Sequence, residues 1–339
     1  MTWKANENTS DIAVSTRVRI ARNLKNTIFP HKASSDVLEK VCAEVCTAIL
    51  DSNSYISKEF NYISIENIKE DEKETLIEKH LISPNLALKK NGAGALINKD
   101  EKISIMINEE DHIRIQCILP GLSLENAYDM ANKIDDLLEE KIEYAFDDRY
   151  GYLTSCPTNL GTGIRMSVML HLPALTLTHN INGILKTVSR YGLTIRGIYG
   201  EGTESIGDLF QISNQNSLGM TENEILLNVK AVTKGVIKRE RALRNMLFEK
   251  DNCAIKDKIM RSYGILTYAQ TIDLKEAMQL LSIIRLGVDM GIITTITIDQ
   301  INEIIKNIHP AILKGLIEID ENKECINQKR AEYIRNLLR

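Results

Sequence analysis

The sequence predicts an α+β protein in which a sheet built mainly from antiparallel strands comes first and a helical region follows. Three patterns lead to this prediction. Strand-type alternation recurs from Ala13 to about Leu218, a short acidic turn joins two of the strands, and strand patterns stop after Thr221. We therefore expect a sheet-containing domain over residues 1–221 and a helical domain over residues 222–339.

Alternation of apolar and polar residues defines the strands of the first part. In the earliest one Val18 and Ile20 alternate with Arg17 and Arg19, so the two arginines share a face. The acidic turn Glu109-Glu110-Asp111 is too short for a crossover, which predicts an antiparallel hairpin rather than a Rossmann-like unit. The expected strands are Val14–Ile20, Phe60–Ile65, Ala95–Asn98, Ile103–Ile107, Ile113–Leu119, Met166–Leu172, Leu193–Tyr199 and Leu209–Ser213.

Helical periodicity appears between the strands and then takes over. Ser123 is expected to cap the third helix, and Thr221 with Glu224 matches a capping box at the start of a long amphipathic helix. The expected helices are Ser35–Asp51, Lys69–Leu81, Ser123–Ala145, Leu175–Tyr191, Thr221–Lys250, Leu274–Gly287, Ile298–Ile308 and Asn327–Leu338.

Bulk composition limits the functional classes. The net charge of −4 argues against a dedicated nucleic-acid binder, which normally carries a basic excess. The polar N-terminus lacks the apolar segment of a secretory signal, and no apolar run approaches the roughly 20 residues that span a bilayer. Six scattered cysteines without a CxxC pair suggest a reducing compartment. We expect a cytoplasmic protein with no membrane and no direct nucleic-acid partner.

Five arginines lie on or beside strands, next to turns rich in glycine or carboxylates. Two neighbouring guanidinium groups on one strand face repel each other unless an anion lies between them, and the phosphates of ATP have suitable geometry. The plainer alternative is a solvated basic strand. The sequence has neither a Walker A motif nor a protein-kinase glycine loop, so arginines would form the phosphate clamp. The five are Arg17, Arg19, Arg114, Arg165 and Arg196.

Two carboxylates and a thiol accompany these arginines. Glu110 lies in the hairpin turn, and Glu201 lies between two glycines after a strand. Together they suit the capture of a cationic nucleophile such as a guanidinium, and one of them would accept the departing proton. Cys156 opens the run Cys-Pro-Thr-Asn-Leu-Gly-Thr-Gly-Ile-Arg and is a candidate for contact with the same cation. Solvated turns and an inert cysteine are the alternatives.

These segments, with Ser-Thr-Arg-Val-Arg at 15–19, closely resemble the ATP:guanido phosphotransferases, and within them the bacterial protein arginine kinases. The resemblance extends over nearly the whole chain and implies a guanido-kinase catalytic domain with Mg-ATP as the phosphoryl donor. It implies catalytic roles for Glu110, Glu201 and Cys156. It also implies an ATP site formed by Ser15, Thr16, Arg17, Val18, Arg19, His80, Arg114, Arg165, Met166, Ser167, Val168, Met169, Arg196, Gly197, Ile198, Tyr199, Gly200 and Glu201.

The resemblance further implies protein substrates with exposed arginines, which are marked for a Clp protease, and relief of stress-gene repression. The implied partners are a zinc-binding activator, a stress-gene repressor, a Clp ATPase and a second copy of the chain. Metabolic guanidino kinases have a helical domain of about a hundred residues before the Ser-Thr-Arg-Val-Arg strand. Only fourteen residues precede it here, which favours an open site and a protein substrate.

A second departure concerns regulation. The Arg-Asp-x-x-Arg-Ala motif that binds phosphoarginine in protein arginine kinases aligns with residues 326–331, where the first Arg-Asp is replaced by Ile-Asn. Lys329 and Arg330 would form a degenerate phosphoarginine site, and a solvated terminal helix is the alternative. A kinase for a free small guanidine and a non-catalytic adaptor that binds ATP or phosphoarginine are the competing functions.

Overall fold

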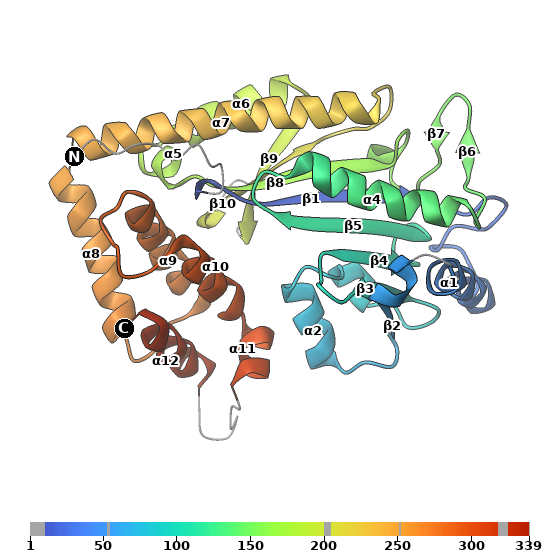
Figure 1. The fold of residues 1–339 in the computed structure, drawn as a ribbon, viewed down its shortest axis with the longest axis horizontal. Coiled ribbons are helices and arrows are strands. Elements are labelled where there is room, and N and C mark those ends of the chain that lie inside the picture. The colour runs from blue at the N-terminus through green and yellow to red at the C-terminus, as the bar shows by residue number, and fades with distance from the viewer. Residues whose placement is uncertain (1–10, 53–54, 200–204, 251, 318–324, 339) are drawn as a thin grey trace. The chain divides into compact units, whose positions relative to one another are not determined.

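The computed structural model describes residues 11–52, 55–199, 205–250, 252–317 and 325–338 (Figure 1). The chain divides into two compact units that are not contiguous in sequence. The sheet unit comprises Ser15–Val168 and Ser213–Ala231, and the helical unit comprises Met1–Val14, Met169–Ile212 and Val232–Arg339. Among the described helices, none is long and apolar enough to cross a membrane.

The strands confirm the predicted α+β class. Eight of them form one sheet in the order β2-β3-β4-β5-β1-β8-β10-β9, and β6 pairs with β7 in a separate hairpin. The pairings β2–β3, β3–β4, β4–β5 and β1–β5 are antiparallel, so the hairpin predicted across the acidic turn is confirmed. The strands are β1 (Ala13–Arg22), β2 (Phe60–Ser64), β3 (Gly94–Asn98), β4 (Ile103–Ile107), β5 (Ile113–Pro120), β6 (Phe146–Asp147), β7 (Gly151–Tyr152), β8 (Ile164–His171), β9 (Leu193–Tyr199) and β10 (Ser205–Asn214).

The helices follow the predicted pattern with several differences. They are α1 (Ser35–Leu50), α2 (Glu70–Glu78), α3 (Pro84–Ala87), α4 (Leu124–Glu139), α5 (Pro173–Leu177), α6 (Ile181–Arg190), α7 (Glu222–Lys250), α8 (Asn252–Tyr268), α9 (Leu274–Asp289), α10 (Ile298–Asn307), α11 (Pro310–Leu316) and α12 (Ile326–Leu338). The helix predicted over 175–191 is instead two short helices, because His179 between them adopts a left-handed conformation with φ 56°. The sequence pattern does not predict α8 or α11.

One predicted helix cap is confirmed in full, and the other is confirmed in position but not in its side-chain hydrogen bond. Thr221 and Glu224 exchange the hydrogen bonds of a capping box at the start of α7. Ser123 occupies the predicted N-cap position of α4, but its side chain makes no capping hydrogen bond because its hydroxyl donates to the Pro120 carbonyl. The Ser123 amide itself donates to the Thr16 hydroxyl, which ties this helix start to β1.

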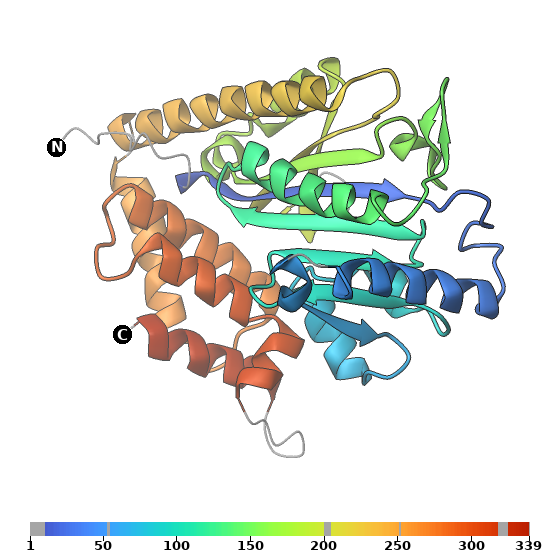
Figure 2. The ribbon, with the colours of Figure 1, turned by 45° about the vertical axis from the view of Figure 1, so that its right-hand side comes forward.

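Alternation along β1 separates the two faces of the sheet. Val18 and Ile20 are fully buried, and the next side chain on their face, Arg22, reaches Asp135 of α4. Helix α4 packs along β5 and covers this face (Figure 2). Arg17 and Arg19 therefore project from the face opposite α4. The sheet unit thus has one apolar, helix-covered face and one face that carries the arginines.

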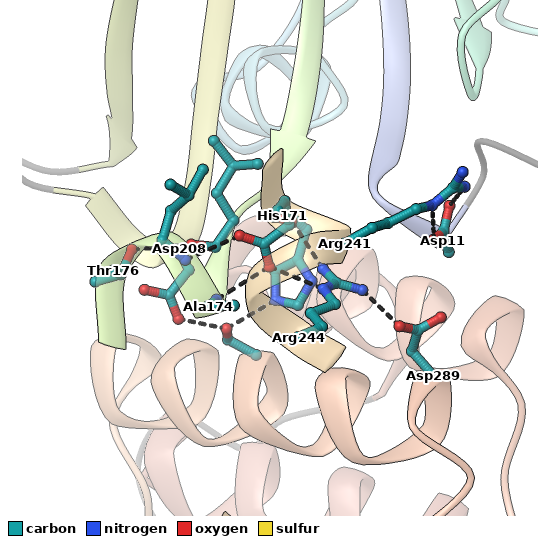
Figure 3. A network of polar contacts seen from close by, with 12 residues as sticks. Asp11, His171, Ala174, Thr176, Asp208, Arg241, Arg244 and Asp289 are labelled. Carbon is teal, nitrogen blue, oxygen red and sulfur yellow. Dashed lines mark hydrogen bonds and ion pairs between the residues drawn. The ribbon is translucent and has the colours of Figure 1, made fainter. Parts of the chain in front are cut away.

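The helical unit has its own core and a buried ion network. Its core is formed by apolar side chains of α8, α9, α10 and α12, together with Leu209 of β10. Arg244 of α7 is fully buried and donates to Glu240, Asp289 and the His171 carbonyl (Figure 3). His171 in turn contacts the Ser282 hydroxyl at 2.8 Å, and burial beside positive charge lowers the pKa of its imidazole well below the ordinary value. This imidazole is neutral and structural.

Candidate active site

Three adjacent strands bring four of the predicted arginines together in the sheet unit. Arg17 and Arg19 come from β1, and the neighbouring strands β5 and β8 contribute Arg114 and Arg165. Burial, and then the positive charge of Arg114, lowers the pKa of Arg17 to about 9. Burial and the charge of Arg17 lower the pKa of Arg19 as well. Guanidinium groups gathered at such an electrostatic cost indicate a site for a polyanion.

Glutamine and glutamate side chains hold two of these arginines in place. Gln116 accepts a hydrogen bond from the Arg17 Nε at 2.6 Å. Glu109 forms an ion pair with Arg114 at 2.5 Å and also accepts from the Ser83 hydroxyl. Burial opposes the ionisation of Glu109, but Arg114 and the Ser83 hydrogen bond outweigh it and lower the pKa of this carboxyl. Glu109 is therefore an anion at neutral pH and a structural counter-charge within the cluster.

Glu110 and Cys156 line the same small cavity. Its volume is about 110 Å³, and Arg19, Arg114 and Arg165 also contribute to its walls. Partial burial, with the negative charges of Asp111 and Glu109, raises the pKa of the Glu110 carboxyl. The Cys156 Sγ lies 3.0 Å from the Thr158 hydroxyl. The structure thus joins a carboxylate, a thiol and several guanidinium groups around one small space.

Asp111 fixes the position of the acidic turn and of the chain that leads to the thiol. Its Oδ1 accepts hydrogen bonds from the Asn23 side chain at 2.6 Å and from the Ser155 amide at 2.7 Å. The Ser155 hydroxyl donates to the Glu110 carbonyl at 2.9 Å. These bonds tie the acidic turn to the residue before Cys156. Sequence reasoning placed Asp111 in the acidic turn but gave neither it nor Asn23 a role, because their partners lie far away along the chain.

Arg22 anchors the loop between Cys156 and β8, the strand that carries Arg165. It is buried, pairs with Asp135 at 2.6 Å, and donates to the Thr162 carbonyl at 2.8 Å. Its guanidinium also lies 3.5 Å from the ring centroid of Tyr152. Gly163 is required beside it, because a Cβ there would come within 2.6 Å of the Arg22 Nη1. Arg22 is thus a further residue that the sequence pattern did not reveal.

The other residues predicted for the ATP site are distributed over both units. Thr16, Val18, Met166, Ser167 and Val168 are buried on β1 and β8 and support the arginines. His80 has a left-handed backbone, and its carbonyl accepts from the Gln116 side chain at 2.6 Å, so it lies beside the partner of Arg17. Ser15 begins the sheet unit.

The remaining predicted residues belong to the helical unit or lie outside the described residues. Arg196 and Gly197 lie on β9, where Arg196 is exposed, and Met169, Ile198 and Tyr199 are strand residues of the same unit. Gly200 and Glu201 lie outside the described residues. The second predicted carboxylate therefore has no described position.

The predicted phosphoarginine residues are engaged within α12. Arg330 is buried and donates from Nε to the Ile308 carbonyl at 2.9 Å and from Nη1 to the Ile272 carbonyl at 3.1 Å. Its Nη1 also contacts the Asn327 side chain. Lys329 forms an ion pair with Glu332 at 3.2 Å. In this arrangement Arg330 connects α12 to the preceding helices.

Comparison with known proteins connects this geometry to a family. Residues 40–243 match the model of the ATP:guanido phosphotransferase C-terminal catalytic domain, and residues 252–339 match the protein-arginine kinase McsB C-terminal domain. A protein-arginine kinase of Halothermothrix orenii is 48% identical over 97% of this chain and 93% of its own length. One from Caldanaerobacter subterraneus is 47% identical, with coverage of 96% of both chains.

Solved structures agree with the fold. Lombricine kinase aligns with a TM-score of 0.61 at 25% identity, covering 69% of this chain and 67% of the other. A duplicated taurocyamine kinase from Schistosoma mansoni aligns with a TM-score of 0.63 at 24% identity, covering 77% of this chain and 39% of the other. The family models and the relatives above show a kinase that phosphorylates arginine with ATP. The chain belongs to the protein-arginine kinases of the ATP:guanido phosphotransferase family.

Proposed function

We propose that the enzyme phosphorylates arginine side chains of proteins by direct in-line transfer of the γ-phosphoryl group of Mg-ATP. The observation that carries this proposal is the small cavity in which Glu110 and Cys156 meet the guanidinium groups of Arg19, Arg114 and Arg165. A nucleophile held at the carboxylate would face a phosphoryl group held by the arginines. Such positioning alone supplies a large part of phosphoryl-transfer catalysis.

The arginine cluster binds the phosphates in this mechanism. Arg17, Arg19, Arg114 and Arg165 carry charge that Glu109 balances in part, so the triphosphate would relieve their mutual repulsion. Arg196 is the fifth proposed phosphate ligand. The Mg²⁺ ion is held mainly by the phosphates, as part of the substrate. Charge that develops on the transferring group is then stabilised by donors already in place.

Glu110 holds and deprotonates the target guanidinium. A guanidinium is a poor nucleophile because its charge is delocalised and its pKa exceeds about 12. As the nitrogen attacks the γ-phosphorus, the bond to the β–γ bridging oxygen breaks and ADP leaves. The proton lost from the nitrogen passes to a Glu110 oxygen, whose raised pKa favours its acceptance. Glu201 is the second carboxylate of this proposal.

Cys156 supports the substrate cation and does not accept the phosphoryl group. It lines the cavity together with Glu110, and its Sγ contacts the Thr158 hydroxyl. A sulfur at this position would orient the guanidinium through a weak hydrogen bond. Loss of the thiol should therefore reduce turnover less than loss of a carboxylate.

The test is an assay for acid-labile phosphate on a casein-like protein and on free arginine, each with Mg-ATP. Glu110→Gln and Glu201→Gln should bind ATP but lose at least roughly a hundredfold in turnover. Cys156→Ala should lose less, and exposed Glu140→Gln is the matched control with unchanged activity. Near wild-type activity of either catalytic glutamate variant, or a trapped phosphocysteine, would refute the assigned roles. Labelling of free arginine alone would refute the protein substrate.

We also propose, from membership of the family, that the modification directs proteins to a Clp protease and relieves stress-gene repression. A zinc-binding activator, a repressor and a Clp ATPase are the proposed partners. A homodimer is proposed through the helical unit, where α8 exposes Ile265 and Tyr268 one turn apart. Sedimentation at micromolar concentration should give the mass of a dimer, and a strict monomer would contradict this arrangement.

A further inference from the structure

A second, larger cavity lies in the sheet unit and has no role in the mechanism above. Its volume is about 970 Å³, and its walls come from α4, the β6–β7 hairpin, the start of α7 and the loop between Cys156 and Arg165. Several large apolar side chains that line it are unusually exposed, among them Phe146 at 56%, Leu218 at 49% and Leu227 at 54%. Apolar side chains gathered at one opening are typical of an interaction site.

Acidic side chains surround these apolar groups. Glu125, Asp129 and Glu222 line the cavity, and Arg149 is the single cation among the described residues of its wall. Glu125 pairs with Lys230 and Glu222 accepts from Tyr128, whereas Asp129 lies exposed at the wall. Such walls repel a nucleotide and attract a cationic partner. The net negative charge of the wall therefore disfavours a second ATP site and favours a basic polypeptide segment.

One thin wall separates this cavity from the catalytic cavity. Thr162 lines the large cavity, and the next residue, Gly163, lines the catalytic one. Consecutive Cα atoms are about 3.8 Å apart, so the two spaces are neighbours. On β1, Ala21 faces the catalytic cavity and Arg22 faces α4, which places the two spaces on opposite faces of the sheet. A bound chain would reach both by passing around the ends of β1 and β8 at this loop.

We infer that the large cavity is a docking site for the substrate protein, which binds a large apolar side chain and an adjacent basic residue several positions from the target arginine. The inference rests on the proposed function, because the second anchor matters only if the substrate is a polypeptide. An extended chain advances about 3.3 Å per residue, so a handful of residues spans the wall at the ends of these strands. The enzyme would thus select arginines in apolar, basic surroundings.

Synthetic peptides with a single arginine test the inference. One series carries Phe-Lys at two to eight residues from the arginine, and the reference peptide carries Ser-Ser instead. The wild-type enzyme should prefer the best-spaced Phe-Lys peptide by about tenfold in kcat/KM, as expected for burial of one aromatic side chain. Absence of turnover on every peptide would refute the proposed function, and the docking site with it. Equal turnover of all peptides would refute the docking site alone.

Variants of the cavity wall provide the matched comparison. Leu227→Ser and Asp129→Lys should each reduce the preference to below about threefold, as expected when an apolar or charged anchor is removed, while turnover of the Ser-Ser peptide stays unchanged. Leu88→Ser and Asp136→Lys change an exposed leucine and an exposed α4 aspartate outside the cavity and should preserve the preference.

Two measurements distinguish loss of docking from a folding defect and from a change in assembly. ATP binding and the unfolding midpoint of each wall variant should match those of the wild type. An equal fall in kcat/KM on the Phe-Lys and Ser-Ser peptides would then count against docking. Sedimentation of Leu227→Ser should match that of the wild type. If this substitution instead dissociates an oligomer, the cavity is an interface between copies of the chain and the substrate-docking inference is wrong.

Discussion

Removal of the Arg22 side chain should destabilise the protein in a strongly pH-dependent way. The Arg22→Leu substitution leaves Asp135, which is 4% exposed, without its 2.6 Å partner. Burial already raises the pKa of Asp135 although Arg22 opposes this effect. Without the guanidinium, the carboxylate avoids an unpaired buried charge by taking up a proton. Folding of the variant therefore becomes coupled to protonation.

The magnitude follows from the cost of that protonation. Protonating a carboxyl of ordinary pKa 3.8 at pH 7 costs about 4 kcal/mol, at about 1.4 kcal/mol per pH unit. Loss of the hydrogen bond to the Thr162 carbonyl adds about 1 kcal/mol. The total of about 5 kcal/mol at pH 7 should fall by about 2 kcal/mol at pH 5.5. The sign follows because the folded variant holds a proton that the unfolded chain has released, so its stability increases as pH falls.

Urea unfolding at several pH values measures this effect. The deficit of Arg22→Leu relative to wild type should shrink on acidification. The double variant Arg22→Leu/Asp135→Leu removes the buried carboxyl and should lose most of the pH dependence. A deficit that is constant between pH 5.5 and 7 would show that Asp135 is not the group that carries the cost. It would also refute the role of Arg22 as its essential partner.

Three other predictions follow from buried groups. Glu109→Gln removes the counter-charge of Arg114, so the affinity for ATP should change by about tenfold or more in a titration. Unaltered affinity and turnover would contradict the role of Glu109 in positioning Arg114. Below about pH 6.5 the folded wild-type protein binds fewer protons than its unfolded chain, because the pKa of buried His171 is lowered, so its stability should fall as pH falls. His171→Asn should abolish this loss of stability, and parallel urea–pH profiles of the two proteins would contradict the prediction. Free phosphoarginine should activate weakly or not at all, because Arg330 is committed to carbonyl groups; a saturable rise in rate that Arg330→Ala abolishes would show a working pocket.

Local sequence patterns predict most of the fold. The alternation in β1, the hairpin across the acidic turn and the capping box at Thr221 depend on residues close together in the chain, so the sequence predicts them correctly. Helix α8 escapes prediction because it follows α7 after a single residue, Asp251, and one polar residue of N-cap type between two helical patterns is a weak sign of a new start. The break at His179 escapes it because a histidine at positive φ has no reliable sequence signal.

The candidate site shows the same division between local and distant information. Glu110, Cys156 and the arginines are predictable because their residue types and spacing indicate chemistry, and the structure brings Glu110 and Cys156 to one cavity with three of the arginines. Asn23 and Arg22 are not, because their partners Asp111 and Asp135 lie 88 and 113 residues away. Hydrogen bonds over such separations leave no periodic trace. They become visible only when the strands are paired.

The loop between Cys156 and Arg165 connects these findings. Gly161 packs so closely that a Cβ would come within 2.8 Å of the Leu218 backbone, and Gly163 packs equally closely on β1. Because both sides of the loop are in contact, a ligand on the Leu218 side would act on the segment between the Cys156 thiol and Arg165, the proposed phosphate ligand. The Arg22 anchor limits this movement by holding the Thr162 carbonyl. Precise placement of the proposed catalytic groups therefore depends on a buried charge pair that lies on the opposite face of the sheet.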